Sequence, residues 1–188
     1  MRDISLHLMD IVQNSIRAQA AKIQIRMTHQ ENGLLTLMVE DDGIGMDREL
    51  LARVQSPFAT TRMSRRVGLG LPLITENAQR TGGDVKIESE PGKGTLLTAV
   101  FHTDHIDCPP MGDLAGTILA LVVANPETPD FVFQLTAPYG EASLDTRLVR
   151  EVLQGVPLNE PEVVAWMQST LKEEIQQVFG GTDNEIHR

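Results

Sequence analysis

Cysteine, aromatic residues and basic residues are all scarce in this chain of 188 residues. The lone cysteine, Cys108, excludes an internal disulfide and is typical of the reducing cytoplasm, so we expect a cytoplasmic location. Aromatic residues make up 4% of the chain, which predicts an aliphatic core. Sixteen Lys and Arg residues against 26 Asp and Glu residues give a net charge of −10, which argues against a nucleic-acid partner.

Long hydrophobic runs are also absent. The longest apolar stretch, 114–124, is too short to cross a bilayer, and the N-terminus lacks the apolar core of a secretory signal. We therefore expect no association with a membrane. A Walker-type phosphate loop is absent too, and no G-x-G-x-x-G follows a predicted strand, which excludes the commonest nucleotide-binding folds.

The charge divides the chain into two parts. Residues 1–104 carry 12 basic and 13 acidic residues, whereas residues 105–188 carry 4 and 13. Because this length suits one domain with a small appendage, we expect a domain over 1–104 and a small acidic α+β region over 105–188. We expect the acidic region to bind an unidentified protein with a basic surface, and the oligomeric state stays open.

Hydrophobic periodicity predicts the order of the secondary-structure elements. In the first part, the expected elements are a helix over 3–18, strands at 22–28 and 34–40 joined by an Asn-Gly hairpin, a short helix ending near 54, a helix over 71–81, and strands at 85–90 and 95–102. In the second part, they are a helix or strand over 114–124, a strand at 131–137, and helices over 145–154 and 159–179, the last capped by Asn159. This order predicts an α/β two-layer sandwich, with a mixed sheet and helices on one face.

The polar face of the first predicted helix carries the first candidate site. Asp3, His7, Asp10, Asn14 and Arg17 recur there at helical spacing. A carboxylate that polarises water, an amide oxygen that binds Mg²⁺ and a cation for phosphate oxygens together suit phosphate chemistry. On helical patterning alone, a solvated helix face is the favoured interpretation.

The second candidate is Asp41-Asp42-Gly43-Ile44-Gly45, where a predicted strand ends in a glycine turn. A buried Asp41 would accept a hydrogen bond from an exocyclic amine such as N6 of adenine. The two glycines would let the backbone approach a flat ligand closely. An ordinary tight turn is an equally good interpretation of this segment.

The third candidate is Gly68-Leu69-Gly70-Leu71, which opens a predicted helix after the most basic stretch of the chain. Free amides at a helix N-terminus bind anions, and Arg62, Arg65 and Arg66 would add positive charge for a phosphate. A surface loop with unrelated arginines is the alternative. The segment 91–95, Pro-Gly-Lys-Gly-Thr, indicates on its own only a turn between two strands.

In this order, these segments resemble the boxes of the GHKL ATPase superfamily, which includes gyrase, heat-shock chaperones, histidine kinases and MutL. The matching segments are 10–14 for the N-box, 41–45 for the adenine-binding box, 57–62 for the phenylalanine box of histidine kinases, 68–70 for the second glycine box and 92–95 for the third. The resemblance covers about residues 1–103. It implies a Bergerat-type sandwich in which the 55–70 loop is a lid over ATP.

The resemblance also implies ATP and Mg²⁺ as cofactors and assigns roles to single residues. Asp10 would be the catalytic carboxylate, Asn14 would bind Mg²⁺, and Asp41 would bind N6 of adenine. Thr95 would hold the carboxylate or a water beside adenine. The remaining implied nucleotide contacts are Arg17, Gly43, Gly45, Met46, Thr60, Thr61, Arg62, Arg66, Gly68, Leu69, Gly70 and Leu71.

Departures from the family pattern leave two functions open. Asp10 stands where the gyrase-like and MutL-like members usually carry Glu, whereas Arg17 and the 57–62 segment resemble the kinase branch. Only nine residues precede Asp10, so we expect no phosphoacceptor histidine domain. The first function is an ATPase or a stand-alone protein kinase, histidine-kinase-like or anti-sigma-like. The second is a nucleotide-gated interaction module with little or no turnover.

A cluster of His102, His105 and Cys108 lies at the junction of the two parts. Histidines, carboxylates and a thiol at this spacing can bind a transition metal. Because no second ligand cluster occurs elsewhere, a linker is the favoured interpretation, and metal binding stays open.

Overall fold

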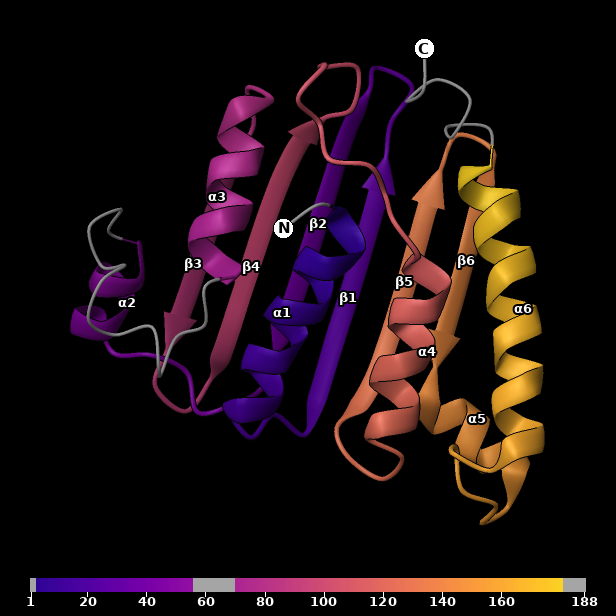
Figure 1. Cartoon of the computed structure of the whole chain (residues 1–188). Coiled ribbons are helices and arrows are strands. Elements are labelled where there is room, and N and C mark those ends of the chain that lie inside the picture. Colours follow the sequence, from indigo (N-terminus) through magenta and orange to yellow (C-terminus); the bar gives the residue numbers. More distant parts are fainter. Residues whose placement is uncertain (1–2, 56–69, 181–188) are drawn as a thin grey trace.

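One mixed sheet runs through the chain. The structure is a computed structural model that describes residues 3–55 and 70–180 (Figure 1). In the described residues, the strands are β1 (Lys22–His29), β2 (Leu34–Asp41), β3 (Asp84–Glu90), β4 (Gly94–His102), β5 (Asp130–Ala137) and β6 (Gly140–Asp145). They form a six-stranded sheet in the order β3-β4-β2-β1-β5-β6.

The pairing of β1 with β5 joins the two parts of the sequence. These two strands are parallel, with Ile25 opposite Phe133, whereas every other described pair is antiparallel. The acidic second part thus adds two strands to the sheet of the first. The predicted domain boundary after residue 104 lies between β4 and β5, which belong to one continuous sheet. The division into two domains therefore stays a prediction.

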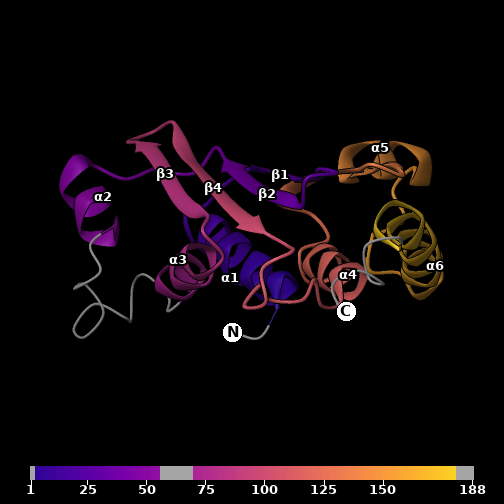
Figure 2. The same ribbon diagram turned by 90° about the horizontal axis from the view of Figure 1, so that it is seen from above.

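The main helices form a single layer on one face of this sheet. The described helices are α1 (Ile4–Arg17), α2 (Arg48–Gln55), α3 (Gly70–Arg80), α4 (Leu114–Ala124), α5 (Thr146–Leu153) and α6 (Pro161–Phe179). Figure 2 shows α1, α3, α4 and α6 on the same side of the strands, with α2 and α5 toward the two ends of the sheet. This arrangement confirms the predicted α/β fold with a mixed sheet.

The core lies between these two layers. Alternate residues of the central strands are buried, as period-2 patterning requires, and Ile23, Ile25 and Met27 of β1 are examples. The core is mainly aliphatic, as predicted, but the phenylalanines of the described residues are all buried in it. Phe131 and Phe133 are buried on β5 with their ring centroids 5.8 Å apart.

Three details of residues 105–180 either settle an alternative that the sequence left open or differ from the sequence prediction. The segment 114–124 is a helix, and Asp113 Oδ1 caps it by accepting a hydrogen bond from the Gly116 amide at 2.8 Å. Helix α6 begins after Glu160, so the predicted cap at Asn159 is wrong, although Pro161 stands in the first turn as expected. Strand β6 was not predicted, because its sequence contains Gly, Glu, Ser and Asp and is only half covered as an edge strand.

Candidate functional site

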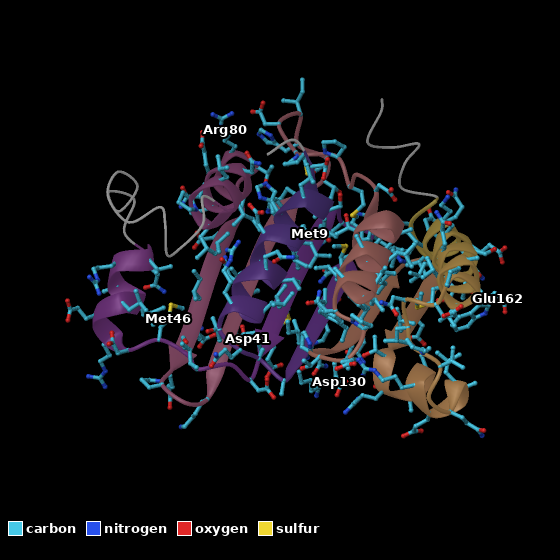
Figure 3. The ribbon with its side chains drawn as sticks, turned by 60° about the horizontal axis from the view of Figure 1, so that its bottom comes forward. Met9, Asp41, Met46, Arg80, Asp130 and Glu162 are labelled. Atoms are coloured by element: carbon cyan, nitrogen blue, oxygen red, sulfur yellow. The ribbon has the colours of Figure 1, made fainter. Side chains whose placement is uncertain are left out.

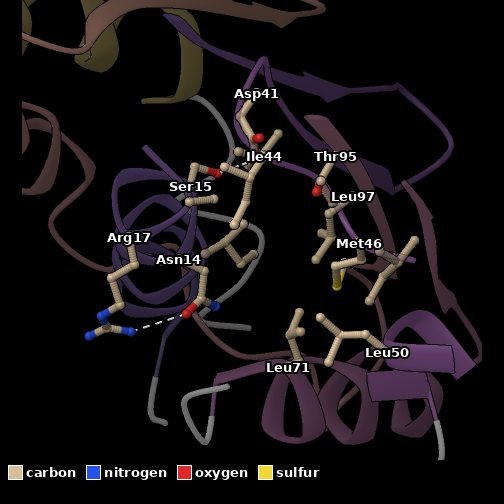
Figure 4. A pocket seen from close by; sticks show the side chains of 15 residues that line it. Asn14, Ser15, Arg17, Asp41, Ile44, Met46, Leu50, Leu71, Thr95 and Leu97 are labelled. Carbon is tan, nitrogen blue, oxygen red and sulfur yellow. Dashed lines mark hydrogen bonds between the residues drawn. The ribbon is translucent and has the colours of Figure 1, made fainter. Parts of the chain in front are cut away.

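A cavity of about 210 Å³ lies between α1, the start of α3 and the adjoining ends of β2 and β4. Its walls are mainly aliphatic with few polar groups, a combination that suits a flat heterocycle (Figure 4). The lining residues are Ile11, Asn14, Ser15, Arg17, Ala18, Val39, Asp41, Ile44, Gly45, Met46, Leu50, Leu71, Ile87, Thr95 and Leu97.

Asp41 is the buried carboxylate of this cavity, with 7% of its surface exposed. The Ser15 hydroxyl donates to Asp41 Oδ2 at 2.6 Å, and the Gly43 amide donates to Asp41 Oδ1 at 3.0 Å. A carboxylate offers about four acceptor positions, so two hydrogen bonds leave both oxygens able to accept more. Asp41 is thus a buried residue of the cavity with acceptor positions left, and its contact with a ligand stays a prediction.

Glycines are required in the turn after Asp41, because other backbone packs directly against it. A Cβ on Gly43 would stand 2.7 Å from the Ala18 carbonyl oxygen at the end of α1. Gly45 has a φ of +66°, and a Cβ there would collide with the carbonyl group of Glu90. The turn is thus held between α1 and the β3–β4 hairpin.

Ser89 connects that turn to the β3–β4 hairpin. Its hydroxyl accepts a hydrogen bond from the Met46 amide at 2.8 Å and donates to the Gly94 carbonyl at 2.8 Å. A hydroxyl has a single hydrogen, so Thr95 must donate in the 2.9 Å contact between Thr95 Oγ1 and Ser89 Oγ. Thr95, directly opposite Asp41 in the β2–β4 register, is thereby fixed at the cavity wall.

Two residues of the polar face of α1 reach the cavity, Asn14 and Arg17. Arg17 Nη1 donates to Asn14 Oδ1 at 3.1 Å (Figure 4). The amide oxygen of Asn14 keeps a second lone pair, so it remains able to serve as a ligand of a hard cation.

Asp10 lies one turn earlier on α1 and does not line the cavity. It adjoins Gly70, the first residue of α3, where a Cβ would stand 2.9 Å from Asp10 Oδ2. The structure thus brings together two candidates that are 60 residues apart in the sequence. Because the first amides of a helix carry partial positive charge, this corner suits an anionic group.

His7 departs from the predicted polar face of α1. It is fully buried, because it faces α3, and Asn77 Nδ2 donates to His7 Nε2 at 2.8 Å. His7 Nδ1 has no hydrogen-bond partner among the described residues. Burial lowers the pKa of His7 from 6.5 to about 4. The prediction of a solvent-facing stripe is therefore wrong at this position.

Several candidates belong to the segment between α2 and α3. Thr60, Thr61, Arg62, Arg66, Gly68 and Leu69 all lie outside the described residues, as does most of the 55–70 loop. Gly70 and Leu71 are described and buried, and Leu71 lines the cavity.

The junction cluster forms no metal site in the part of the chain that the structure covers. Within residues 3–55 and 70–180, no group of three His, Cys, Asp or Glu side chains could hold a metal ion. Burial raises the pKa of the Cys108 thiol to about 11, which opposes formation of a metal-binding thiolate.

The sequence interpretation missed Ser15, Ser89 and the apolar walls Ile44, Leu50, Ile87 and Leu97. Ser15 had a detectable signal, because it is a small polar residue on the apolar face of α1, between Val12 and Ile16. Ser89 had none, since its role depends on which turn packs against its strand.

The described helices differ from membrane-spanning ones. None of them combines the length and apolar character that a membrane span needs.

The first part of the chain is similar to known proteins. Residues 2–105 match the family of histidine kinase-, DNA gyrase B- and HSP90-like ATPases. A putative sensor protein of Shewanella frigidimarina is 34% identical over 97 residues, which are 50% of this chain and 15% of that protein. The histidine-protein kinase AtoS of Escherichia coli is 33% identical over 96 residues, covering 50% of this chain and 16% of the kinase.

The solved structures include the MutL ATPase domain of Aquifex aeolicus complexed with ADP. It is 17% identical, with a TM-score of 0.46, over 82% of this chain and 70% of that one. The matched part of this chain covers only about a sixth of the length of the two curated relatives, the sensor protein and AtoS. The family match covers more than half of the chain, and it ends where β4 and the following turn end. The chain therefore belongs to the family of histidine kinase-, DNA gyrase B- and HSP90-like ATPases.

Proposed function

We propose that this protein binds ATP with Mg²⁺ in the cavity beside α1 and catalyses transfer of the terminal phosphoryl group. The observation that carries the proposal is the buried Asp41 carboxylate in an otherwise aliphatic cavity of about 210 Å³. An adenine ring would place its apolar faces against Met46, Leu97 and their neighbours and donate its 6-amino group to Asp41. Gly43 and Gly45 allow the turn to lie close to the base.

The phosphates would lie toward the start of α3. Free amides of its first turn, at Gly70 and Leu71, suit phosphate oxygens, and Arg17 adds a cation at the cavity edge. We propose that Thr60, Thr61, Arg62, Arg66, Gly68 and Leu69 complete this part of the site.

Mg²⁺ fits the donor set of the site. Asn14 supplies a neutral oxygen ligand, and Mg²⁺ is commonly held by one or two protein oxygens together with phosphate and water. When bound, the ion would neutralise charge on the phosphates. Asp10, next to the α3 N-terminus, would orient the attacking group and accept its proton.

Two forms of this activity differ in the group that accepts the phosphoryl group. Water as the acceptor makes the protein an ATPase, and a side chain of another protein makes it a histidine-kinase-like or anti-sigma-like protein kinase. The acidic region would bind the protein partner, since three bases against eleven acids lie in residues 105–180.

A second function is favoured by the position of Asp10. The side chain of Asp10 is one methylene shorter than that of the glutamate usual in related ATPases, and Asp10 does not line the cavity. In this alternative, ATP binding alone changes what the acidic region binds, and little turnover occurs.

An assay with Mg²⁺ and γ-labelled ATP distinguishes these functions. Phosphate release and protein labelling are measured for the wild type, for Asp10→Asn and for Asp47→Asn. The last is a matched control, because Asp47 is an exposed residue at the start of α2 outside the cavity. We expect turnover that Asp10→Asn abolishes with ATP affinity retained and that Asp47→Asn preserves. Binding without turnover in the wild type would favour the gated module, and absence of ATP binding would overturn both functions.

A further inference from the structure

We propose that Ser15 is a positioning residue that aims the Asp41 carboxylate at the 6-amino group of adenine and so sets the preference of the site among purines. This inference rests on the proposed binding of ATP. It concerns a residue outside the boxes used to recognise the family, and it follows from the contacts of Ser15 in the cavity.

Ser15 occupies a buried position on α1 with 3% of its surface exposed. It lines the cavity, and Figure 4 shows its side chain beside Asp41. Its hydroxyl donates to Asp41 Oδ2 at 2.6 Å, a short distance typical of a hydrogen bond to an ionised acceptor. This contact connects α1 to the end of β2 across 26 residues of sequence.

The two donors to Asp41 act on different oxygens. Gly43 holds Oδ1 through its amide, and Ser15 holds Oδ2 through its hydroxyl. The torsion that rotates a carboxylate has a broad energy minimum, so one donor alone fixes the plane poorly. With both donors in place, the carboxylate plane is fixed, and the unused acceptor positions keep one direction relative to the cavity.

A fixed acceptor discriminates among purines by what stands at ring position 6. The 6-amino group of adenine donates to it, whereas the 6-oxo group of guanine is an acceptor and would face another acceptor. Purine riboside triphosphate carries only hydrogen at this position and would neither donate nor repel. The ratio of its dissociation constant to that of ATP therefore measures the hydrogen bond to Asp41 alone.

The experiment measures calorimetric dissociation constants for ATP and purine riboside triphosphate on the full chain with Mg²⁺. The variants are Ser15→Ala, Ser15→Thr and Ser5→Ala. Ser5 is a matched control, because it is also a buried serine of α1 and its hydroxyl donates to Asp3 Oδ1 at 2.8 Å, at the far end of the helix. Thermal unfolding of each variant reports whether it folds.

In the wild type, we expect ATP to bind about 10- to 100-fold more tightly than the analogue, the range of a hydrogen bond to a charged group. In Ser15→Ala, we expect this ratio to fall about fivefold or more, through weaker ATP binding with little change for the analogue. Ser15→Thr, which keeps a hydroxyl, should restore the ratio, and Ser5→Ala should leave it unchanged.

The outcomes separate the inference from the function. An undiminished ratio in folded Ser15→Ala would overturn the inference and leave ATP binding intact. An equal loss for both nucleotides would also overturn it, since that pattern indicates only a disturbed cavity. If the wild type binds neither nucleotide, the proposed function itself fails.

Discussion

Gly70 and Asp10 are packed so closely that no side chain fits between them. A Cβ on Gly70 would stand 2.8 Å from Asp10 Cβ and 2.9 Å from Asp10 Oδ2. The start of α3 and the candidate catalytic carboxylate on α1 are thus a single packed unit. In the proposed function, this contact sets the distance between the acid and the amides that would hold phosphate.

Gly70→Ala should disturb that unit. The added methyl group must push α3 away from α1, which we expect to destabilise the protein by about 1–3 kcal/mol and to lower turnover more than tenfold. Denaturant unfolding and the phosphate-release assay measure the two effects. Pro72→Ala, at an exposed position in the first turn of the same helix, is the control and should leave turnover unchanged.

Asp41→Ala should remove the proposed contact with adenine and also leave buried donors without a partner. The Ser15 hydroxyl and the Gly43 amide both donate to this carboxylate. We expect ATP affinity to fall at least tenfold and the free energy of unfolding to fall by about 1–3 kcal/mol. Calorimetry with ATP and urea unfolding measure these changes. Full ATP affinity in the variant would contradict the assigned role of Asp41.

Ser89→Ala should loosen the turn that carries Gly43 and Gly45, which would lie beside adenine in the proposed function. The variant leaves the Met46 amide without its acceptor and frees Thr95 from its hydrogen bond. We expect a loss of about 1 kcal/mol in stability and a several-fold weaker affinity for ATP, because the turn must be ordered on binding. Ser143→Ala, an exposed serine on β6, is the matched control. Equal affinities for all three proteins would refute a role of Ser89 in the site.

His7 should make stability depend on pH in a defined range. Its pKa is about 4 in the folded protein and near 6.5 when unfolded, so the unfolded chain binds the proton first as the pH falls. The free energy of unfolding should therefore fall between about pH 6.5 and pH 4, by about 3 kcal/mol in total. Urea unfolding at several pH values measures this slope.

The variant His7→Gln isolates this effect. Glutamine keeps a polar group near Asn77 but does not titrate. The slope of the unfolding free energy against pH between pH 6.5 and 4 should therefore decrease by the amount that corresponds to the uptake of about one proton on unfolding. His105→Gln changes an exposed histidine and should keep the wild-type slope. An unchanged slope in His7→Gln would show that other groups cause the pH dependence.

The order of most elements and the position of Asp41 at the cavity were predictable from the sequence, because both depend on local patterns. Periodicity identified α1, and the glycine spacing after Asp41 identified the turn that the structure places at the cavity. What the sequence did not reveal depends on packing between distant segments. His7 follows the spacing of the polar face of α1 yet is buried against α3. Ser89 becomes part of the site only through its hydrogen bonds with the Met46 amide and the Thr95 hydroxyl. Strand β6 escaped prediction because an edge strand needs little apolar alternation.

The parallel pairing of β1 with β5 makes the acidic region a structural support of the part that matches the ATPase family. Without β5, the row of backbone amides and carbonyls on one side of β1 would lose its partners, from Lys22 to Thr28. Strand β1 begins shortly after the helix that carries Asn14 and Ser15. Occupation of the cavity by a ligand should consequently raise the melting temperature of α5 and α6 as well, so that both ends of the chain denature in a single cooperative event.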